Sequence, residues 1–406
     1  IFFRLVALML MSWIAIIVAV VAICAWPLLS VLPFPYEAIT VKDLLDERFT
    51  RLVQVLASAK CGQPLVPCGS KFEGNKRLQD QGRLSRLFQG KIIGSESVAV
   101  SPTGRLTMLD KYGYMHHAVD GTDPPELEVN IGGQLYIGPG RPLGYHYLSN
   151  DILLVCDSLK GLIEVNLTSS QIRILANHAA GRPVNYANDL DVDPTGRLVF
   201  FSDSTRGNVG YHATGFYDTM RSFLLNMYSA DVTGRLLEYD LHTGQSSLVM
   251  DDVWYANGVA VAPGGDYVLL VETMGFRVLR KWLRGSKKGQ VDTLIENLPG
   301  FPDGISRSSD GNYWVCLVVP LSPLLKFLKH RMARHLLAHI SVTLGVFKYI
   351  AKQWGCVVKI SPEGQILDVL MDPTGQSISS ISAVTEQNGK LYLGNLGGDY
   401  VSVYQL

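Results

Sequence analysis

Apolar and polar residues alternate in short runs from about residue 90 to residue 318, and glycine-containing turns separate these runs. A period of two is typical of β-strands, because successive side chains of a strand point to opposite faces of the sheet. The turns Pro102-Thr103-Gly104, Asp310-Gly311 and Asn388-Gly389 place residues that tolerate a positive φ between apolar runs. The gaps are too short and too rich in glycine for the crossover helices of an α/β sheet. The pattern therefore predicts an all-β fold.

The alternating runs form a repeated unit, in which an opening residue is followed by an apolar strand, a turn and a second strand. The six copies open at Glu96, Leu143, Asn188, Asn257, Asp303 and Ser382. They are spaced by roughly 45 to 50 residues, with two gaps of roughly 70 to 80, and a four-stranded propeller blade takes about 40 to 50 residues. A unit this small buries a core only by stacking on its neighbours. The repeats predict a six-bladed β-propeller over residues 87–406.

The N-terminal segment, residues 1–36, differs in kind from the rest. No charge occurs between Arg4 and Glu37, and Leu5 to Trp26 is an almost unbroken apolar run, long enough for the roughly 20 residues that span a bilayer as a helix. A cleaved signal peptide has a shorter apolar core of about 7 to 15 residues, so we expect an uncleaved transmembrane anchor. Arg4 before the run predicts a cytoplasmic N-terminus. The chain is then a single-pass membrane protein with its propeller on the lumenal or extracellular side.

Two further segments depart from the alternation. Residues 37–86 carry apolar side chains at helical spacing and then a polar stretch, which predicts a juxtamembrane helix and a linker to the propeller. Residues 320–352 interleave apolar side chains with Lys326, Lys329 and Arg331. This pattern predicts a basic amphipathic helical insertion, and two interpretations stay open. Its apolar face contacts membrane lipid, or the insertion caps the propeller with its charges in water.

Composition narrows the partners and the compartment. The 406 residues carry 36 Lys and Arg against 36 Asp and Glu, and this neutral balance argues against nucleic acid as a partner. Three cysteines in apolar strands are predicted to be buried thiols, namely Cys156, Cys316 and Cys356. Cys61 and Cys68 flank a short loop, where a disulfide bond and two free thiols are both open. A disulfide there, together with the sequon Asn166-Leu167-Thr168, would fit a glycoprotein of an oxidising lumen.

Equivalent positions of successive blades converge on the central channel of a propeller. Four of the six openings carry an oxygen ligand, namely Glu96, Asn188, Asn257 and Asp303. Two carboxylates and two amides suit Ca²⁺, which takes about six to eight oxygen ligands, whereas zinc or copper would require His or Cys. Asn and Asp also open strands because they form turns, but recurrence at one repeat position favours a calcium site in the channel.

Several short motifs resemble the strictosidine synthase-like family. They are Arg141-Pro142-Leu143-Gly144, Tyr255-Ala256-Asn257-Gly258-Val259, Val271-Glu272-Thr273 and the run from Asn297 to Gly304. The similarity extends from about residue 88 to the C-terminus and includes the basic insertion. It implies a six-bladed propeller related to paraoxonases and other calcium-dependent esterases, with single-pass members and some arylesterase activity. By the same resemblance, the calcium ligands of the family fall on Glu96, Asn188, Asn257 and Asp303.

The chain departs from the family at three positions. Gly304 stands where relatives usually carry Asn, Leu143 at the catalytic histidine of paraoxonases, and Ser382 near the glutamate of strictosidine synthase. A Pictet–Spengler condensation needs a base to remove a proton. Because that glutamate is missing, strictosidine synthesis is not expected.

Two functions of different classes stay open. The first is calcium-assisted hydrolysis of a small ester or lactone, in which Asp303 or Asp189 activates water and His146 replaces the missing histidine. The second is a catalytically inactive propeller that keeps calcium to stabilise the fold and binds a protein partner at a membrane.

Overall fold

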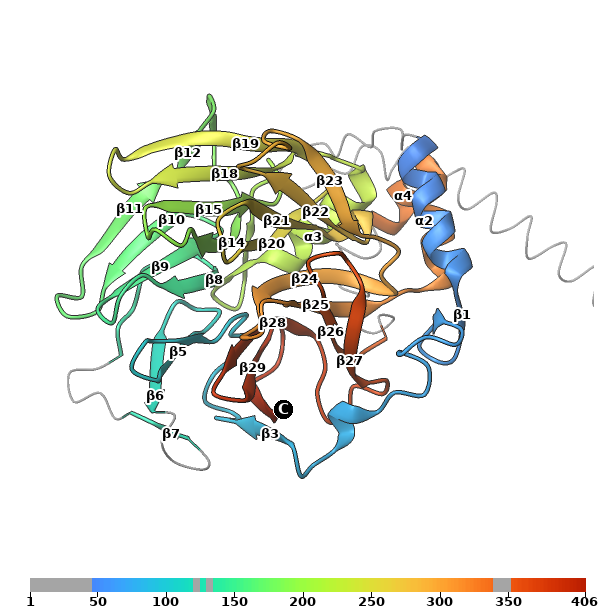
Figure 1. Ribbon diagram of the computed structural model, residues 1–406, viewed down its shortest axis with the longest axis horizontal. Helices are drawn as coiled ribbons and strands as arrows, with labels where there is room; N and C mark the ends of the chain where they lie inside the picture. Colours follow the sequence, from blue (N-terminus) through green and yellow to red (C-terminus); the bar gives the residue numbers. More distant parts are fainter. Residues whose placement is uncertain (1–45, 120–124, 129–133, 339–351) are drawn as a thin grey trace, which may run out of the picture.

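The computed structural model describes residues 46–119, 125–128, 134–338 and 352–406. Within these residues, six four-stranded antiparallel sheets are arranged in a ring, and the chain colours run round it in order (Figure 1). The all-β six-bladed propeller is confirmed.

Each of the first three blades is continuous in the sequence or interrupted by a single insertion. They consist of β4 (Ala99–Val100), β5 (Arg105–Leu109), β6 (Met115–Val119) and β7 (Glu126–Leu127); β8 (Pro142–Tyr147), β9 (Ile152–Asp157), β10 (Gly161–Asn166) and β11 (Ile172–Ala176); and β14 (Ala187–Val192), β15 (Leu198–Asp203), β18 (Gly234–Asp240) and β19 (Gln245–Val253). The short hairpin β12 (His178–Ala179) and β13 (Arg182–Pro183) connects the second blade to the third.

The last three blades continue round the ring. They consist of β20 (Ala256–Val261), β21 (Tyr267–Glu272), β22 (Arg277–Trp282) and β23 (Val291–Ile295); β24 (Gly300–Arg307), β25 (Tyr313–Pro320), β26 (Gly355–Ile360) and β27 (Ile366–Asp372); and β28 (Ile381–Gln387), β29 (Lys390–Asn395), β30 (Val401–Gln405) and β3 (Leu84–Leu87). One turn of 3-10 helix, η2 (Thr273–Gly275), follows β21.

The innermost strands β4, β8, β14, β20, β24 and β28 surround the channel, and each contacts the inner strands of both neighbouring blades. Every opening residue predicted from the repeats lies within three residues of the start of one of these strands. The repeat position read from the sequence therefore corresponds to one level of the channel.

The ring closes through β3, which pairs with β30 as the outermost strand of the last blade. Most of this strand lies in the segment predicted as a linker, 37–86, since the propeller was expected to begin at residue 87. Its two end residues, Leu84 and Leu87, are buried, while Ser85 and Arg86 between them are exposed. Because a strand this short shows no clear alternation, the period of two did not reveal it.

Apolar layers between adjacent blades form the core. Between the fifth and sixth blades, for example, Trp314, Val357 and Leu393 pack in one cluster. Cys156, Cys316 and Cys356 are fully buried free thiols, as predicted.

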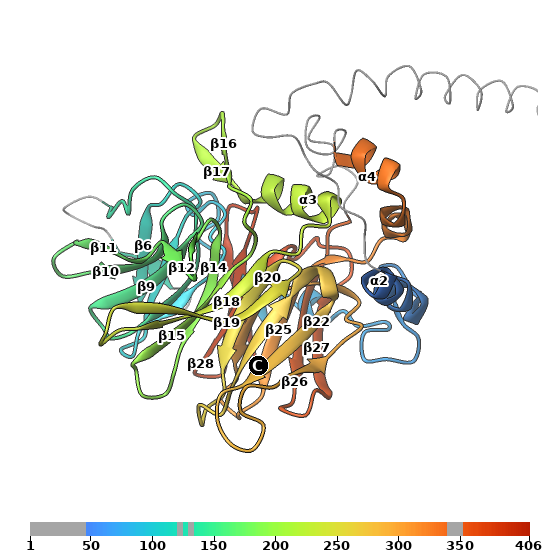
Figure 2. The ribbon, with the colours of Figure 1, turned by 90° about the horizontal axis from the view of Figure 1, so that it is seen from above.

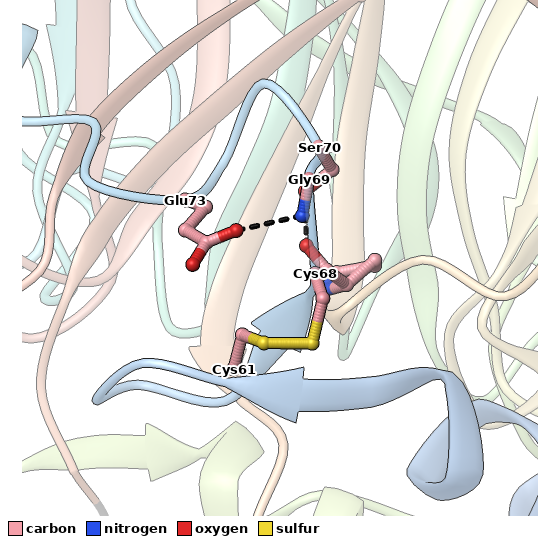
Figure 3. The surroundings of a disulfide bond; sticks show 6 residues. Cys61, Cys68, Gly69, Ser70 and Glu73 are labelled. Carbon is pink, nitrogen blue, oxygen red and sulfur yellow. Dashed lines mark hydrogen bonds between the residues drawn. A yellow bond between two sulfur atoms is a disulfide. The ribbon is translucent and has the colours of Figure 1, made fainter.

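A disulfide-closed loop lies beside the ring. After α2 (Asp46–Ser58), the hairpin β1 (Ala59–Cys61) and β2 (Val66–Pro67) carries a disulfide bond between Cys61 and Cys68 (Figure 3), which settles the alternative that the sequence left open. The Glu73 carboxylate accepts a hydrogen bond of 2.6 Å from the Gly69 amide next to it. A short 3-10 helix, η1 (Arg77–Gln79), leads on to β3.

Two helical insertions lie on the same side of the propeller (Figure 2) and contact each other. The first is α3 (Thr219–Ser229), which follows the hairpin β16 (Gly210–His212) and β17 (Phe216–Asp218) and is capped by the Asp218 side chain. Because the alternation between about residues 90 and 318 predicts strands, α3 was not expected. The second, η3 (Pro323–Lys329) and α4 (Arg331–Ala338), confirms a helical insertion in the described part of 320–352.

No helix within the described ranges is long and apolar enough to cross a membrane. The anchor predicted at 1–36 lies outside those ranges.

Candidate metal centre

Four oxygen-bearing side chains from four different blades line one cavity of about 40 Å³ at the mouth of the channel. They are the four predicted from the repeat position, namely Glu96, Asn188, Asn257 and Asp303. All four are buried, with 3 to 6% of their surface exposed. A cavity of this size holds more than one water-sized group, since a single water needs about 10 to 15 Å³. The structure thus brings the predicted ligands together.

Two oxygen atoms in this cavity are buried without a hydrogen-bond partner, Glu96 Oε2 and Asn188 Oδ1. The amide nitrogen of Asn188 donates to Ser204 Oγ at 3.0 Å, and Ser204 Oγ donates to the Ala256 carbonyl at 2.6 Å. These bonds fix which end of the Asn188 amide faces the cavity. An unsatisfied buried acceptor costs about 1 to 3 kcal/mol, and a cation coordinated by both oxygens would remove that cost.

The second pair of ligands is already hydrogen-bonded. Asn257 Nδ2 donates to Asp303 Oδ1 and also lies 3.1 Å from Thr273 Oγ1. To become a ligand, Asn257 must therefore turn its amide so that the oxygen faces the ion.

The two carboxyl groups of the cavity lie in an environment that disfavours their charged forms. Burial raises the pKa of Asp303 to about 7, against the hydrogen bond from Asn257, which lowers it. Burial, and then the charge of Asp303, raises the pKa of Glu96 well above its usual value. A divalent cation would compensate both negative charges.

Arg141 supplies a buried positive charge near Glu96, and sequence reasoning missed this role. It is 2% exposed, and its guanidinium donates to the Gly94 carbonyl at 2.8 Å and the Leu396 carbonyl at 3.3 Å. Its charge opposes the rise of the Glu96 pKa. The sequence could have indicated this role, because Arg141 lies two residues before Leu143, the opening residue of the second repeat. Residues two apart in a strand point to the same face.

Aromatic residues form the apolar part of the same cavity. The rings of Tyr186 and Tyr255 lie 5.7 Å apart, and Phe223 of α3 packs edge-on against Tyr255 at 5.3 Å. The sequence contained a signal for the two tyrosines, because the triplet Tyr-Ala-Asn occurs twice and places each ring two residues before a ligand. The helix α3 carries no such signal, yet it covers the cavity.

Asp189 and His146, the other predicted catalytic residues, line a different cavity of about 250 Å³. His146 lies three residues after Leu143 along β8, about 10 Å further down the channel. Asp189 Oδ2 accepts a hydrogen bond of 2.9 Å from the Val259 amide, and burial raises the pKa of Asp189 to about 7. Of the three predicted catalytic residues, Asp303 is the one that lines the cavity with the oxygen ligands.

The departures from the family pattern have structural counterparts. A Cβ atom at Gly304 would lie 2.5 Å from the Ser382 carbonyl of the next blade, so the backbone leaves no room for a side chain here. Leu143 is buried at 1% exposure, and Ser382 Oγ donates to the Glu96 carbonyl at 2.7 Å. Neither Leu143 nor Ser382 is a general base.

The donor set favours a hard cation. No group of three or more His, Cys, Asp or Glu side chains that could hold a metal occurs in the part of the chain that the structure describes. The cavity instead combines two carboxyl groups with two amides, which suits calcium better than zinc.

Comparison with known proteins identifies the family. A family model described as Strictosidine synthase matches residues 188–286. The adipocyte plasma membrane-associated protein of Bos taurus is 32% identical over 346 residues, which cover 81% of this chain and 79% of the relative. The Arabidopsis thaliana protein named strictosidine synthase-like 10 is 31% identical over 77% of this chain and 85% of the relative.

Solved structures share the fold at low sequence identity. A gluconolactonase from Xanthomonas campestris superposes with a TM-score of 0.55 at 16% identity, over 80% of this chain and 89% of that chain. Regucalcin from Agrobacterium tumefaciens, described as a calcium-binding protein, gives a TM-score of 0.51 at 11% identity, over 79% and 92% of the two chains. The motifs, the propeller and the similarity over four fifths of the sequence together show that the chain belongs to the strictosidine synthase-like family, alongside the adipocyte plasma membrane-associated proteins.

Proposed function

We propose that the protein is a calcium-dependent hydrolase of esters or lactones, with its reaction centre in the cavity that Glu96, Asn188, Asn257 and Asp303 line. The observation that carries the proposal is the pair of buried oxygens without partners, Glu96 Oε2 and Asn188 Oδ1, which face a cavity containing a second carboxyl group. The names of the structural relatives, a gluconolactonase and a calcium-binding regucalcin, agree with this chemistry.

Bound calcium would act as a Lewis acid towards the carbonyl oxygen of the substrate. The residues of the chain supply the other functions. Tyr186, Tyr255 and Phe223 form the apolar part of the cavity lining and would lie next to the reacting group. The carboxylate of Asp303, which lines the same cavity, would accept the proton of the attacking water as the general base.

A second candidate function is a binding propeller without catalysis. It is favoured by the family resemblance, which puts Leu143 and Ser382 where catalytic relatives carry a base, and neither side chain is a base. In this case calcium would stabilise the fold, and the protein would act through a protein partner.

We place this function at a membrane. The curated animal relatives are named plasma membrane-associated, and the apolar run at Leu5 to Trp26 is long enough for an anchor. The disulfide between Cys61 and Cys68 agrees with a propeller on the lumenal or extracellular side, where the conditions are oxidising.

The test uses the full chain purified in a mild detergent and assayed on phenyl acetate and on an aliphatic lactone. We expect hydrolysis that EGTA abolishes and calcium restores. Asn257→Ala should lower kcat/KM by about tenfold to hundredfold, because a group that holds the metal site is lost. Asp303→Ala should lower it by about a hundredfold or more, because the general base is lost as well. Asn312→Ala, in a turn of the fifth blade away from the cavity, should leave the rate unchanged.

Equal rates in all three variants would overturn the catalytic proposal. If no ester or lactone is hydrolysed but calcium still raises the thermal midpoint of the wild type and not of Asp303→Ala, the non-catalytic propeller is the correct function.

A further inference from the structure

A larger cavity of about 380 Å³ lies between the propeller and the segments added to it. Phe301 and Val319 of the fifth blade contribute to its lining. Leu65 of the disulfide-closed loop, Tyr228 of α3 and Leu328 of the second helical insertion also line it. Three additions to the blade pattern, far apart in the sequence, thus converge on one cavity.

The lining of this cavity is mainly apolar, and its inner part is buried. Tyr228, Phe301 and Leu328 are each only 4 to 5% exposed although they border an open space. Protein interiors keep few voids larger than a water molecule, and small-molecule sites typically measure about 300 to 1,000 Å³. A cavity of this size and lining is therefore suited to an apolar ligand.

Polar groups gather at the mouth of the cavity. Gln63 and Lys352 are exposed there, and Lys352 Nζ donates to Gln63 Oε1. Among the described residues that line the cavity, Lys352 is the charged one, and no carboxylate accompanies it. An occupant with a long apolar body and one negative group at its end would match this distribution.

We propose that the cavity binds a long-chain fatty acid, with its hydrocarbon chain against Tyr228, Phe301 and Leu328 and its carboxylate at Lys352. The carboxylate takes the place of Gln63 as the acceptor for the Lys352 ammonium, which exchanges a neutral acceptor for a charged and stronger one. The flexible leucine side chains of the insertion adapt to an unbranched chain.

This binding site is separate from the metal centre, although the two are neighbours. Val319 lines both cavities, and the ring of Phe223 in the metal centre lies 5.9 Å from the ring of Phe301. The proposal needs neither calcium nor hydrolysis. The disulfide has a role in it, because the bond between Cys61 and Cys68 closes the loop that carries Gln63 and Leu65.

The test uses the full chain in phospholipid nanodiscs and a palmitate analogue that carries a photoreactive diazirine on its chain. After illumination, the labelled peptides are mapped by mass spectrometry. We expect labelling on Val319 to Leu328 that unlabelled palmitate competes away and that EGTA does not change. Leu328→Trp fills the cavity and should reduce this labelling by about tenfold or more. Phe327→Trp is the matched control, because Phe327 is 53% exposed on the same insertion and does not line the cavity.

The head group is tested by competition with palmitate and with its methyl ester. Wild type should prefer the acid by about tenfold, and Lys352→Met should remove that preference. The proposal is overturned if labelling is equal in Leu328→Trp and Phe327→Trp, or if the methyl ester competes as well as the acid in the wild type. Because the labelling is read in EGTA, a failure of the hydrolase proposal would leave this result unaffected.

Discussion

Arg141 links the candidate metal centre to the backbone of neighbouring blades. Its guanidinium donates hydrogen bonds to the carbonyls of Gly94, which precedes the first blade, and Leu396, which follows β29 of the sixth. Arg141 itself directly precedes β8, the first strand of the second blade. Its charge also acts on Glu96. Few side chains other than arginine carry several donors in a fixed planar arrangement.

Arg141→Met should lower the free energy of unfolding by about 3 kcal/mol, because two buried carbonyls lose their donor and Glu96 loses a compensating charge. Arg141→Lys should not restore the lost stability, since one ammonium cannot reach both carbonyls in the geometry of the guanidinium. Urea unfolding at a fixed calcium concentration measures both variants. A lysine variant as stable as the wild type would contradict this assignment.

For single residues, the repeat positions predicted the ligands of the candidate metal site, which composition alone could not do. Glu96, Asn188, Asn257 and Asp303 were identified because equal positions in a repeat become equal heights in the channel, and all four line one cavity. The roles of Arg141 and Tyr186 were not predicted, because they depend on contacts between blades that no single repeat contains. His146 was predicted to be catalytic because it lies three residues after Leu143 in the sequence. Since β8 is extended, those three residues place His146 in another cavity.

Among the elements, the inner strands and the second helical insertion were predicted from the sequence pattern, whereas β3 and α3 were not. The inner strands β14 and β20 are buried along almost their whole length, and they were recognised because apolar residues alternate with small or polar ones before a glycine-containing turn. By contrast, β3 has only its end residues buried, and α3 lies within a gap between two repeat copies. Sequence patterning reports burial within an element, whereas these two are defined by what they pack against.

The closing strand gives a prediction for an element. Leu87 is 2% exposed and packs in the cluster of the first and last blades, so Leu87→Ala should cost about 2 to 5 kcal/mol of stability. Ser85→Ala on the same strand is the control, because Ser85 is exposed and its change should be within about 0.5 kcal/mol. Denaturant midpoints compare the two, and similar values would show that β3 does not hold the ring closed.

For the whole molecule, the metal centre connects blades that are distant in the sequence. Glu96, Asn188, Asn257 and Asp303 come from the first, third, fourth and fifth blades. A cation held by all of them would add a link across the ring, and it would bind the folded state alone because the unfolded chain disperses its ligands.

Removing calcium with EGTA should therefore lower the thermal midpoint of the full chain, by about 3 to 8 °C from saturating conditions. Glu96→Gln should lose this response. In EGTA it should melt no lower than the wild type, since the variant avoids burying a carboxylate whose pKa burial raises. Differential scanning calorimetry checks both statements, and an unchanged wild-type midpoint in EGTA would exclude a calcium link.

The pairing of β3 with β30 bears on how the protein is made. Leu84 pairs with Tyr404, about 320 residues later, and translation proceeds at about 5 to 20 residues per second. For roughly 16 to 60 s the nascent chain therefore contains β3, while its partner strand β30 has not yet been synthesised. During that interval β3 stays unpaired, and the exposed backbone groups of an unpaired strand can pair with other chains. Biogenesis of this protein should therefore depend on chaperones that shield nascent β-edges until the final strand emerges.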